Sequence, residues 1–275
     1  MKRALLIVAL QVAAFWPVWR WHASRVGDSA DDVWGLLSLG AFALLVWKGG
    51  GARGDGAEAG RGLWLPALVM LVYAVSYPFV LPLARAALAL TALCCTVSLL
   101  RFGRRFHPGL LGLLYLSLPV IPSLQFYGGY PLRVLVAGAA APLLRLGGYA
   151  VFQEGTCLNW AGRLIWVDAP CSGVRMLWVG MFLACALACL YELRPLKTLL
   201  ALAAAAVAIL AGNVLRAAAL FYVEAGVVEG PEWLHEYVGV FAFAAVAVSI
   251  LAAVRWIREF GRCEIGNSST SEPAY

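Results

Sequence analysis

The chain has 275 residues, of which 63% are hydrophobic and 13% are charged, and its mean hydropathy is +0.82. This composition excludes an ordinary soluble domain and indicates a polytopic membrane protein. The formal charge of +6 does not indicate nucleic-acid binding, because the basic residues lie in short clusters between apolar runs, as the positive-inside rule predicts.

Four apolar runs precede residue 101. Tryptophans follow the first run, where a signal peptide would need small residues for cleavage, so we expect an uncleaved span. A Gly-rich stretch from Lys48 to Gly62 predicts a flexible cytoplasmic loop. We expect His107, which lies among arginines, to be a solvated loop residue. The four predicted spans cover residues 4–19, 33–47, 63–81 and 83–100. The cytoplasmic side is marked most firmly by Arg101, Arg104 and Arg105.

A fifth span is expected from Leu110 to about Gln125, kinked by Pro119 and Pro122. The segment 126–170 that follows is less apolar. We expect this segment to lie outside the cytoplasm.

Within that segment, the run Val134–Leu144 is too short to span a bilayer and is flanked by arginines. It predicts a small interfacial helix. The later runs 150–153 and 164–168 are β-like and are separated by turn residues, so we expect a β-hairpin leading into Cys171.

Three further apolar runs predict the last spans, at residues 174–191, 199–223 and 238–256. The expected fold is therefore an all-α polytopic membrane protein with about eight transmembrane helices and both termini in the cytoplasm. We divide the chain into N-terminal helices at 1–109, a membrane domain at 110–262 and a cytoplasmic tail at 263–275 that we expect to be disordered.

A cysteine is placed where the polar segment meets the sixth apolar run. Asp168 can cap a helix there, and Pro170 suits a first turn. The helix dipole would then favour the thiolate of Cys171, which makes it a candidate nucleophile. The alternative is that Cys171 only packs, since cysteine is a common small apolar residue in membrane helices.

We expect two other ionisable side chains to lie at the same depth in the membrane as Cys171. Arg216 in Asn213-Val214-Leu215-Arg216 lies 19 residues after Lys197, or about 29 Å along a helix, the thickness of a hydrocarbon core. His235 lies 20 residues before Arg255, or about 30 Å. We therefore expect all three side chains at the outer interface, on consecutive helices that usually pack as neighbours.

The cysteine motif Cys171-Ser172-Gly173-Val174-Arg175, followed by Asn-x-x-Arg and then histidine, resembles the exosortase and archaeosortase family of membrane-embedded transpeptidases. The resemblance covers roughly residues 110–260. It implies Cys171 as the nucleophile, Arg216 as the charged stabiliser and His235 as the proton carrier, with Ser172 in a supporting position.

Three more residues are candidates for supporting the site. Asn213 lies on the same helix face as Arg216 and can orient it or bind substrate backbone. Gly239, one turn after His235, allows close approach of a neighbouring helix or peptide. Arg175 lies one turn from Cys171 and is the rival of Arg216 for the catalytic role; the resemblance favours Arg216.

The resemblance implies an enzyme that cuts a C-terminal sorting tail and transfers the product to a cell-envelope acceptor. Such a tail has a short motif, a hydrophobic helix and a basic cluster. The expected location is the plasma (inner) membrane, in contact with lipid, with the site at the outer face and with no cofactor or metal.

Two alternatives remain open on the sequence. A transporter or lipid-binding protein could use Arg175 and Arg216 to hold an anionic substrate. A protease would differ only in releasing its product to water. A disulfide between Cys157 and Cys171 would silence the nucleophile, and we expect the other cysteines within the spans to be packing residues.

Overall fold

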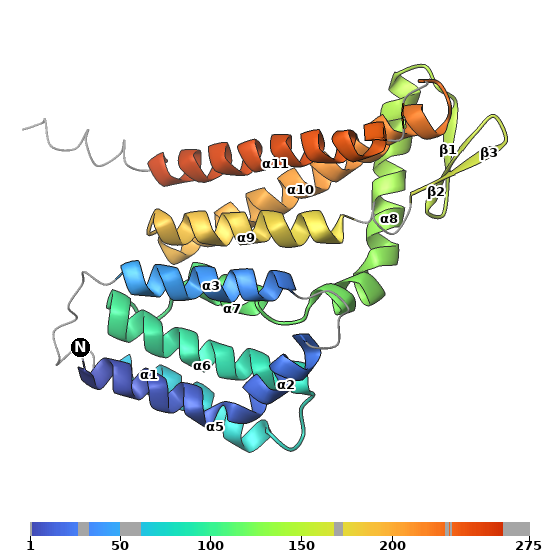
Figure 1. Cartoon of the computed structure of the whole chain (residues 1–275). Coiled ribbons are helices and arrows are strands. Elements are labelled where there is room, and N and C mark those ends of the chain that lie inside the picture. The colour runs from blue at the N-terminus through green and yellow to red at the C-terminus, as the bar shows by residue number, and fades with distance from the viewer. Residues whose placement is uncertain are drawn as a thin grey trace, which may run out of the picture. The chain divides into compact units, whose positions relative to one another are not determined.

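The protein is predominantly helical and divides into two compact units, Met1–Pro122 and Ser123–Tyr275. The structure, a computed structural model, describes residues 2–26, 33–49, 62–167, 173–228, 231 and 233–260. Figure 1 labels the helices and strands of both units.

The first unit is built around one long helix, α6 (Pro82–Phe102), which packs against α1, α2, α5 and α7. Alanines at positions 86, 89 and 92 of α6 are fully buried, so neighbouring helices approach its backbone closely. Helix α3 packs on α7, where Ser38 Oγ donates to Leu113 O at 2.7 Å. The helices surrounding α6 are α1 (Lys2–Ala14), α2 (Trp16–Val26), α3 (Val33–Lys48), α5 (Trp64–Ser76) and α7 (Pro108–Leu116).

The predicted first span is broken into two helices. Helix α1 ends at Ala14 and α2 begins at Trp16, with a turn at Phe15 between them. Pro17 has no backbone N–H to donate and therefore favours a helix start at this point. The tryptophans expected to flank a single span thus lie on a separate helix.

Our expectation that His107 is solvated is wrong. His107 is 2% exposed, forms the N-cap of α7, and its Nδ1 accepts from the backbone N–H of Leu110 at 3.4 Å. Its ring also lies 5.5 Å from that of Phe102. The arginines around His107 suggested a solvated loop, but capping and ring contact place this histidine inside the unit.

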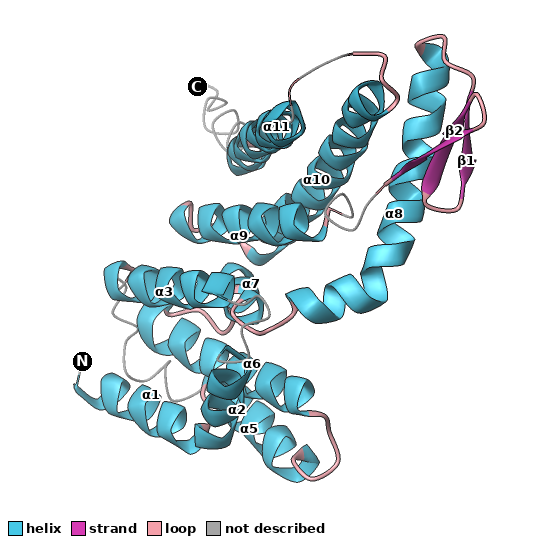
Figure 2. Ribbon diagram, turned by 45° about the vertical axis from the view of Figure 1, so that its right-hand side comes forward, coloured by secondary structure: helices cyan, strands magenta, loops and turns pink. Residues whose placement is uncertain are grey.

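The second unit contains α8 (Ile121–Leu146, beginning at the unit boundary), a small sheet, α9 (Val174–Leu190), α10 (Pro195–Glu224) and α11 (Trp233–Glu259). The sheet consists of β1 (Val151–Glu154), β2 (Cys157–Trp160) and β3 (Arg163–Trp166), antiparallel and in the order β1-β2-β3. Figure 2 shows the sheet lying along α8. One buried cluster joins α8, the sheet and α10, centred on Leu144, Leu158 and Phe221.

Two expectations for this segment need correction. The stretch Val134–Leu144 is no separate interfacial helix, since it forms part of the continuous 26-residue helix α8. Where two strands were expected there are three, because Cys157–Trp160 also pairs. The turns lie at Gly155 and at Ala161-Gly162, all with positive φ.

Helices α9, α10 and α11 pack pairwise and form the part of the unit that carries the predicted site (Figure 1). Glycines allow the close approach: a Cβ atom at Gly212 of α10 would lie 2.1 Å from Val246 of α11. At one end of the three helices, Lys197 Nζ donates to the carbonyl of Arg258 at 3.1 Å. The Arg258 guanidinium lies 4.7 Å from the centre of the Tyr191 ring.

The eight predicted spans are not confirmed. Within the described residues, α6, α10 and α11 are long and apolar enough to cross a membrane, and α7 with α8 adds a fourth if the broken pair forms one span. Helices α3, α5 and α9 are apolar but shorter than 18 residues. These findings support a multi-pass membrane protein.

Candidate active site

Helix α9 begins at Val174, with Gly173 as its N-cap in the left-handed conformation at φ 78°. The N–H of Leu177 donates to Gly173 O at 2.7 Å and closes the first turn. Among the described residues, this helix start has no side-chain cap. Asp168, Pro170, Cys171 and Ser172 lie outside the described residues.

Asn213 of α10 lies against the start of α9. A Cβ atom at Gly173 would lie 2.6 Å from Asn213 Nδ2 and 2.8 Å from its Cγ. The Asn213 side chain is buried, with 3% of its surface exposed. Because Gly173 has no side chain, the Asn213 amide can pack directly on the backbone at this helix start.

Arg216, one turn further along α10, faces α11 instead. A Cβ atom at Gly239 would lie 3.5 Å from Arg216 Nε and 3.7 Å from one of its Nη atoms. These are ordinary contact distances, so the guanidinium packs against Gly239. His235 lies one turn before Gly239 on the same helix face, which brings Arg216 and His235 into the same neighbourhood.

His235 has an acidic neighbour that the sequence did not reveal. The distance from His235 Nδ1 to Oε1 of Glu224, the last residue of α10, is 3.4 Å. Both side chains are about half-exposed, at 42% for His235 and 52% for Glu224. A carboxylate at Nδ1 favours the tautomer that carries its proton there and leaves Nε2 to exchange protons.

The sheet and α10 form a small cavity of about 30 Å³ beside this pair. Arg163 of β3 ties the sheet to the end of α10, since its Nη1 donates to Ala225 O at 3.1 Å. The strand that leads toward Cys171 is therefore held next to His235. The cavity is lined by Leu158, Ile165, Trp166, Val167, Ala217, Leu220, Phe221, Glu224 and His235.

The structure describes five of the seven predicted site residues and brings four of them together. Asn213 contacts the α9 start, Arg216 contacts Gly239, and His235 lies one turn from Gly239. Arg175, in the first turn of α9, is exposed. Cys157 is a free, buried thiol in β2, so the disulfide that would block Cys171 is not formed.

The fold and the site together define a polytopic membrane protein with a polar site. A histidine, an arginine, an asparagine and a glutamate cluster at one end of three apolar helices. A family model described as transmembrane exosortase matches residues 3–252 of the chain, so the chain belongs to the exosortase family, a family of membrane cysteine transpeptidases. No curated protein and no solved structure matches the chain.

The contact between Gly173 and Asn213 yields a testable prediction. Gly173→Ala places a side chain on a left-handed backbone, which costs about 1–2 kcal/mol of stability. The added Cβ atom also overlaps the Asn213 side chain and must displace it. We expect a lower unfolding midpoint and a loss of at least about tenfold in activity per folded molecule, because Asn213 and Arg216 share one helix turn.

Gly103→Ala is the matched control. Gly103 also has a left-handed backbone, at φ 62°, but no atom lies within 4 Å of the added Cβ. It should lower the unfolding midpoint while leaving the activity per folded molecule unchanged. Equal activity of the two variants would show that the contact with Asn213 has no functional consequence.

Proposed function

We propose that this protein is a cysteine transpeptidase that cleaves C-terminal sorting signals of exported proteins and transfers them to a cell-envelope acceptor. The observation that carries the proposal is the position of the Asn-x-x-Arg turn of α10. Its asparagine packs on Gly173, two residues after Cys171, and its arginine packs on α11 one turn from His235. The motif therefore bridges the helix that follows the nucleophile and the helix that holds the proton carrier.

Chain connectivity supports the participation of Cys171. Consecutive Cα atoms are about 3.8 Å apart, so the Cα of Cys171 lies within about 7.6 Å of the Cα of Gly173. Gly173 is in turn in contact with Asn213. This short covalent link supports the proposal that Cys171 acts together with Arg216 and His235.

The reaction follows from what each group can do. The Cys171 thiolate attacks the scissile carbonyl carbon, and the resulting tetrahedral oxyanion collapses to a thioester as the C–N bond breaks. His235 protonates the departing amine through Nε2 and then accepts a proton from the incoming acceptor nucleophile. The acceptor attacks the thioester, and the thiolate leaves.

Arg216 stabilises the negative charge that develops in the transition state. Its guanidinium is always protonated and presents a fixed set of donors. Packing on Gly239 restrains the Arg216 side chain before substrate binds. This restraint lowers the entropic cost of positioning its hydrogen-bond donors for the transition state. Asn213 positions the α9 start, while Arg175 binds a substrate carboxylate or ties helices together, and Ser172 supports the nucleophile.

The proposed substrates carry a C-terminal motif followed by a hydrophobic helix and a basic cluster. Such a tail inserts into the same membrane as the enzyme, with its motif at the outer interface. The site would lie at the extracytoplasmic face of the plasma (inner) membrane. Neither a cofactor nor nucleic acid has a part in this chemistry.

Mass spectrometry of the C-termini of exported proteins, in cells with and without this chain, tests the function. We expect truncated C-termini only when the chain is present. The mass of the new terminus separates transfer, which adds an acceptor, from hydrolysis, which adds water. Unchanged C-termini would refute the proposal and would be the result expected of a transporter.

Glu224 provides a prediction about how His235 is positioned. Exposed charge pairs contribute about 0.2–1 kcal/mol, so Glu224→Gln should lower the rate of tail cleavage only about two- to fivefold. Glu236→Gln, on the same helix turn as His235 but without a charge contact among the described residues, is the control. A loss above a hundredfold in Glu224→Gln would contradict this modest role.

Topology is tested by single cysteines in an otherwise cysteine-free chain. We expect a cysteine at Gly155 to react with a membrane-impermeant thiol reagent in intact cells. Cysteines at Gly54 and Ser268 should react only after the membrane is opened. Labelling of Gly54 but not of Gly155 in intact cells would invert the orientation and remove the site from the outer face.

A further inference from the structure

A polar cavity in the described part of the first unit contains none of the proposed catalytic residues. It has a volume of about 510 Å³ and lies between α2 and the turn that joins α5 to α6. Its lining combines two arginines, Arg20 and Arg85, with aromatic, hydroxyl and proline side chains. The other lining residues are Pro17, Val18, Trp21, Ser24, Tyr77 and Pro82.

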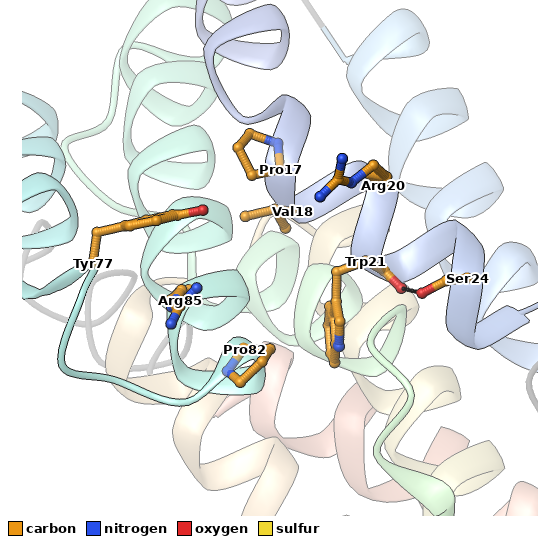
Figure 3. Close-up of a pocket in the computed structure, with 8 residues that line it drawn as sticks. All are labelled: Pro17, Val18, Arg20, Trp21, Ser24, Tyr77, Pro82 and Arg85. Atoms are coloured by element: carbon orange, nitrogen blue, oxygen red, sulfur yellow. Dashed lines mark hydrogen bonds between the residues drawn. The ribbon is translucent and has the colours of Figure 1, made fainter.

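Figure 3 shows how these side chains are arranged. In this view the hydroxyl end of Tyr77 and the guanidinium of Arg20 point toward one another, and Arg85 lies below them. Trp21 and Pro82 bound the lower part of the cavity. The polar ends therefore converge from two separate helices.

Arg85 is held in place by its own loop. Its Nε donates to Val80 O at 2.9 Å, and its guanidinium lies 4.5 Å from the centre of the Tyr77 ring. These two contacts fix the plane of the guanidinium and leave its two Nη groups without a hydrogen bond among the described residues. An arginine fixed in this way presents a paired donor edge that suits a phosphate.

The depth of the cavity points to the membrane interface. Arg85 lies in the first turn of α6 and Arg101 in its last turn, about 24 Å apart at 1.5 Å per residue. That separation is about 6 Å less than a hydrocarbon core of about 30 Å, a difference that the two long arginine side chains can span. Phe79 (85% exposed) and Leu81 (76% exposed) lie in the turn between the lining residues Tyr77 and Pro82, where they can contact acyl chains.

We propose that this cavity binds the phosphodiester of an anionic membrane phospholipid. Arg85 supplies the fixed donors, exposed Arg20 closes on the other side of the phosphate, and the tryptophan and tyrosine rings lie at headgroup level. A carboxylate would use only part of the donor set. The cavity is large enough for a whole headgroup.

Lipid retention by the full-length protein tests the assignment. The protein, purified in detergent, is titrated with phosphatidylglycerol, and native mass spectrometry measures the fraction that carries lipid. Arg20→Gln should weaken lipid binding about fivefold, and the double variant with Arg85→Gln about thirtyfold. Arg105→Gln, an exposed arginine beyond the opposite end of α6, should leave binding at this site unchanged.

Arg20→Gln is the decisive variant, because Arg85→Gln also removes the contact with Val80. Equal lipid retention by wild type and Arg20→Gln, or an equal loss in Arg105→Gln, would overturn the proposal. In a second experiment, inorganic phosphate competes with the bound lipid. Full displacement of lipid by millimolar phosphate would assign the cavity to a free anion and would overturn the lipid assignment.

Discussion

Replacing Cys171 by alanine is expected to abolish tail cleavage, with a loss of at least about a thousandfold, because no other group in the site can form the thioester. Cys171→Ser should be nearly as inactive, since a hydroxyl does not readily form an anion at neutral pH. The measurement is the rate at which purified enzyme in detergent or lipid cleaves a tail substrate. Both variants should still insert and accumulate.

Cys185→Ala is the control for this prediction. Cys185 lies on α9, is 2% exposed and is among the free cysteines, so its thiol only packs. The substitution removes one buried sulfur atom and should leave cleavage nearly unchanged. Continued cleavage in Cys171→Ala at the wild-type rate would show that the covalent mechanism is wrong.

Replacing Arg216 by lysine is expected to have the second largest effect. Lysine keeps the charge but loses the paired donors and the contact of the guanidinium with Gly239. The cost should resemble the loss of one oxyanion donor, about 3–4 kcal/mol or a hundred- to thousandfold in the cleavage rate. Substrate binding, measured by crosslinking in a Cys171→Ala background, should barely change.

Arg175 should respond differently to the same substitution. It is exposed at the start of α9, where it can hold a substrate carboxylate or a neighbouring helix. Arg175→Lys or Arg175→Gln should therefore reduce tail crosslinking or protein level. Full turnover by Arg216→Lys together with a severe loss in Arg175→Lys would reverse the two roles.

The family could be predicted from a few residues, because the chemistry requires them at fixed places. The cysteine motif beginning at Cys171, the turn from Asn213 to Arg216, and His235 were sufficient for the prediction. The family match also covers nearly all of the first hundred residues, where the sequence showed no motif. The described helices of that region pack through apolar side chains, and many different sequences meet this requirement.

Helix boundaries were predictable where one apolar run is bounded by charges, as in α6 and α10. They were not predictable for α8. Arg133 and Arg145 made its second half look like an interfacial segment, yet one helix runs past Arg133 and continues through Pro131 and Pro142. Packing of α8 against the sheet and α10 supplies stability that local sequence does not reveal.

Contacts within the site were predictable only in part. Helix rise predicts the depth of Arg216 and His235, and that depth stays a prediction. Their packing partners, Gly239 and Glu224, depend on how helices rotate about their axes. Glu224 lies 11 residues before His235, with a helix end between them, so no periodicity connects the pair. Only the folded structure brings the carboxylate to the imidazole.

The central claim is that Cys171 carries the substrate as a thioester, and trapping that species tests it most directly. Purified enzyme is mixed with a tail substrate, quenched in acid within one turnover and digested for mass spectrometry. We predict that the peptide containing Cys171 gains the mass of the substrate fragment N-terminal to the cut, and that hydroxylamine removes it. Cleaved tail without any adduct on Cys171 at every time point would contradict the account.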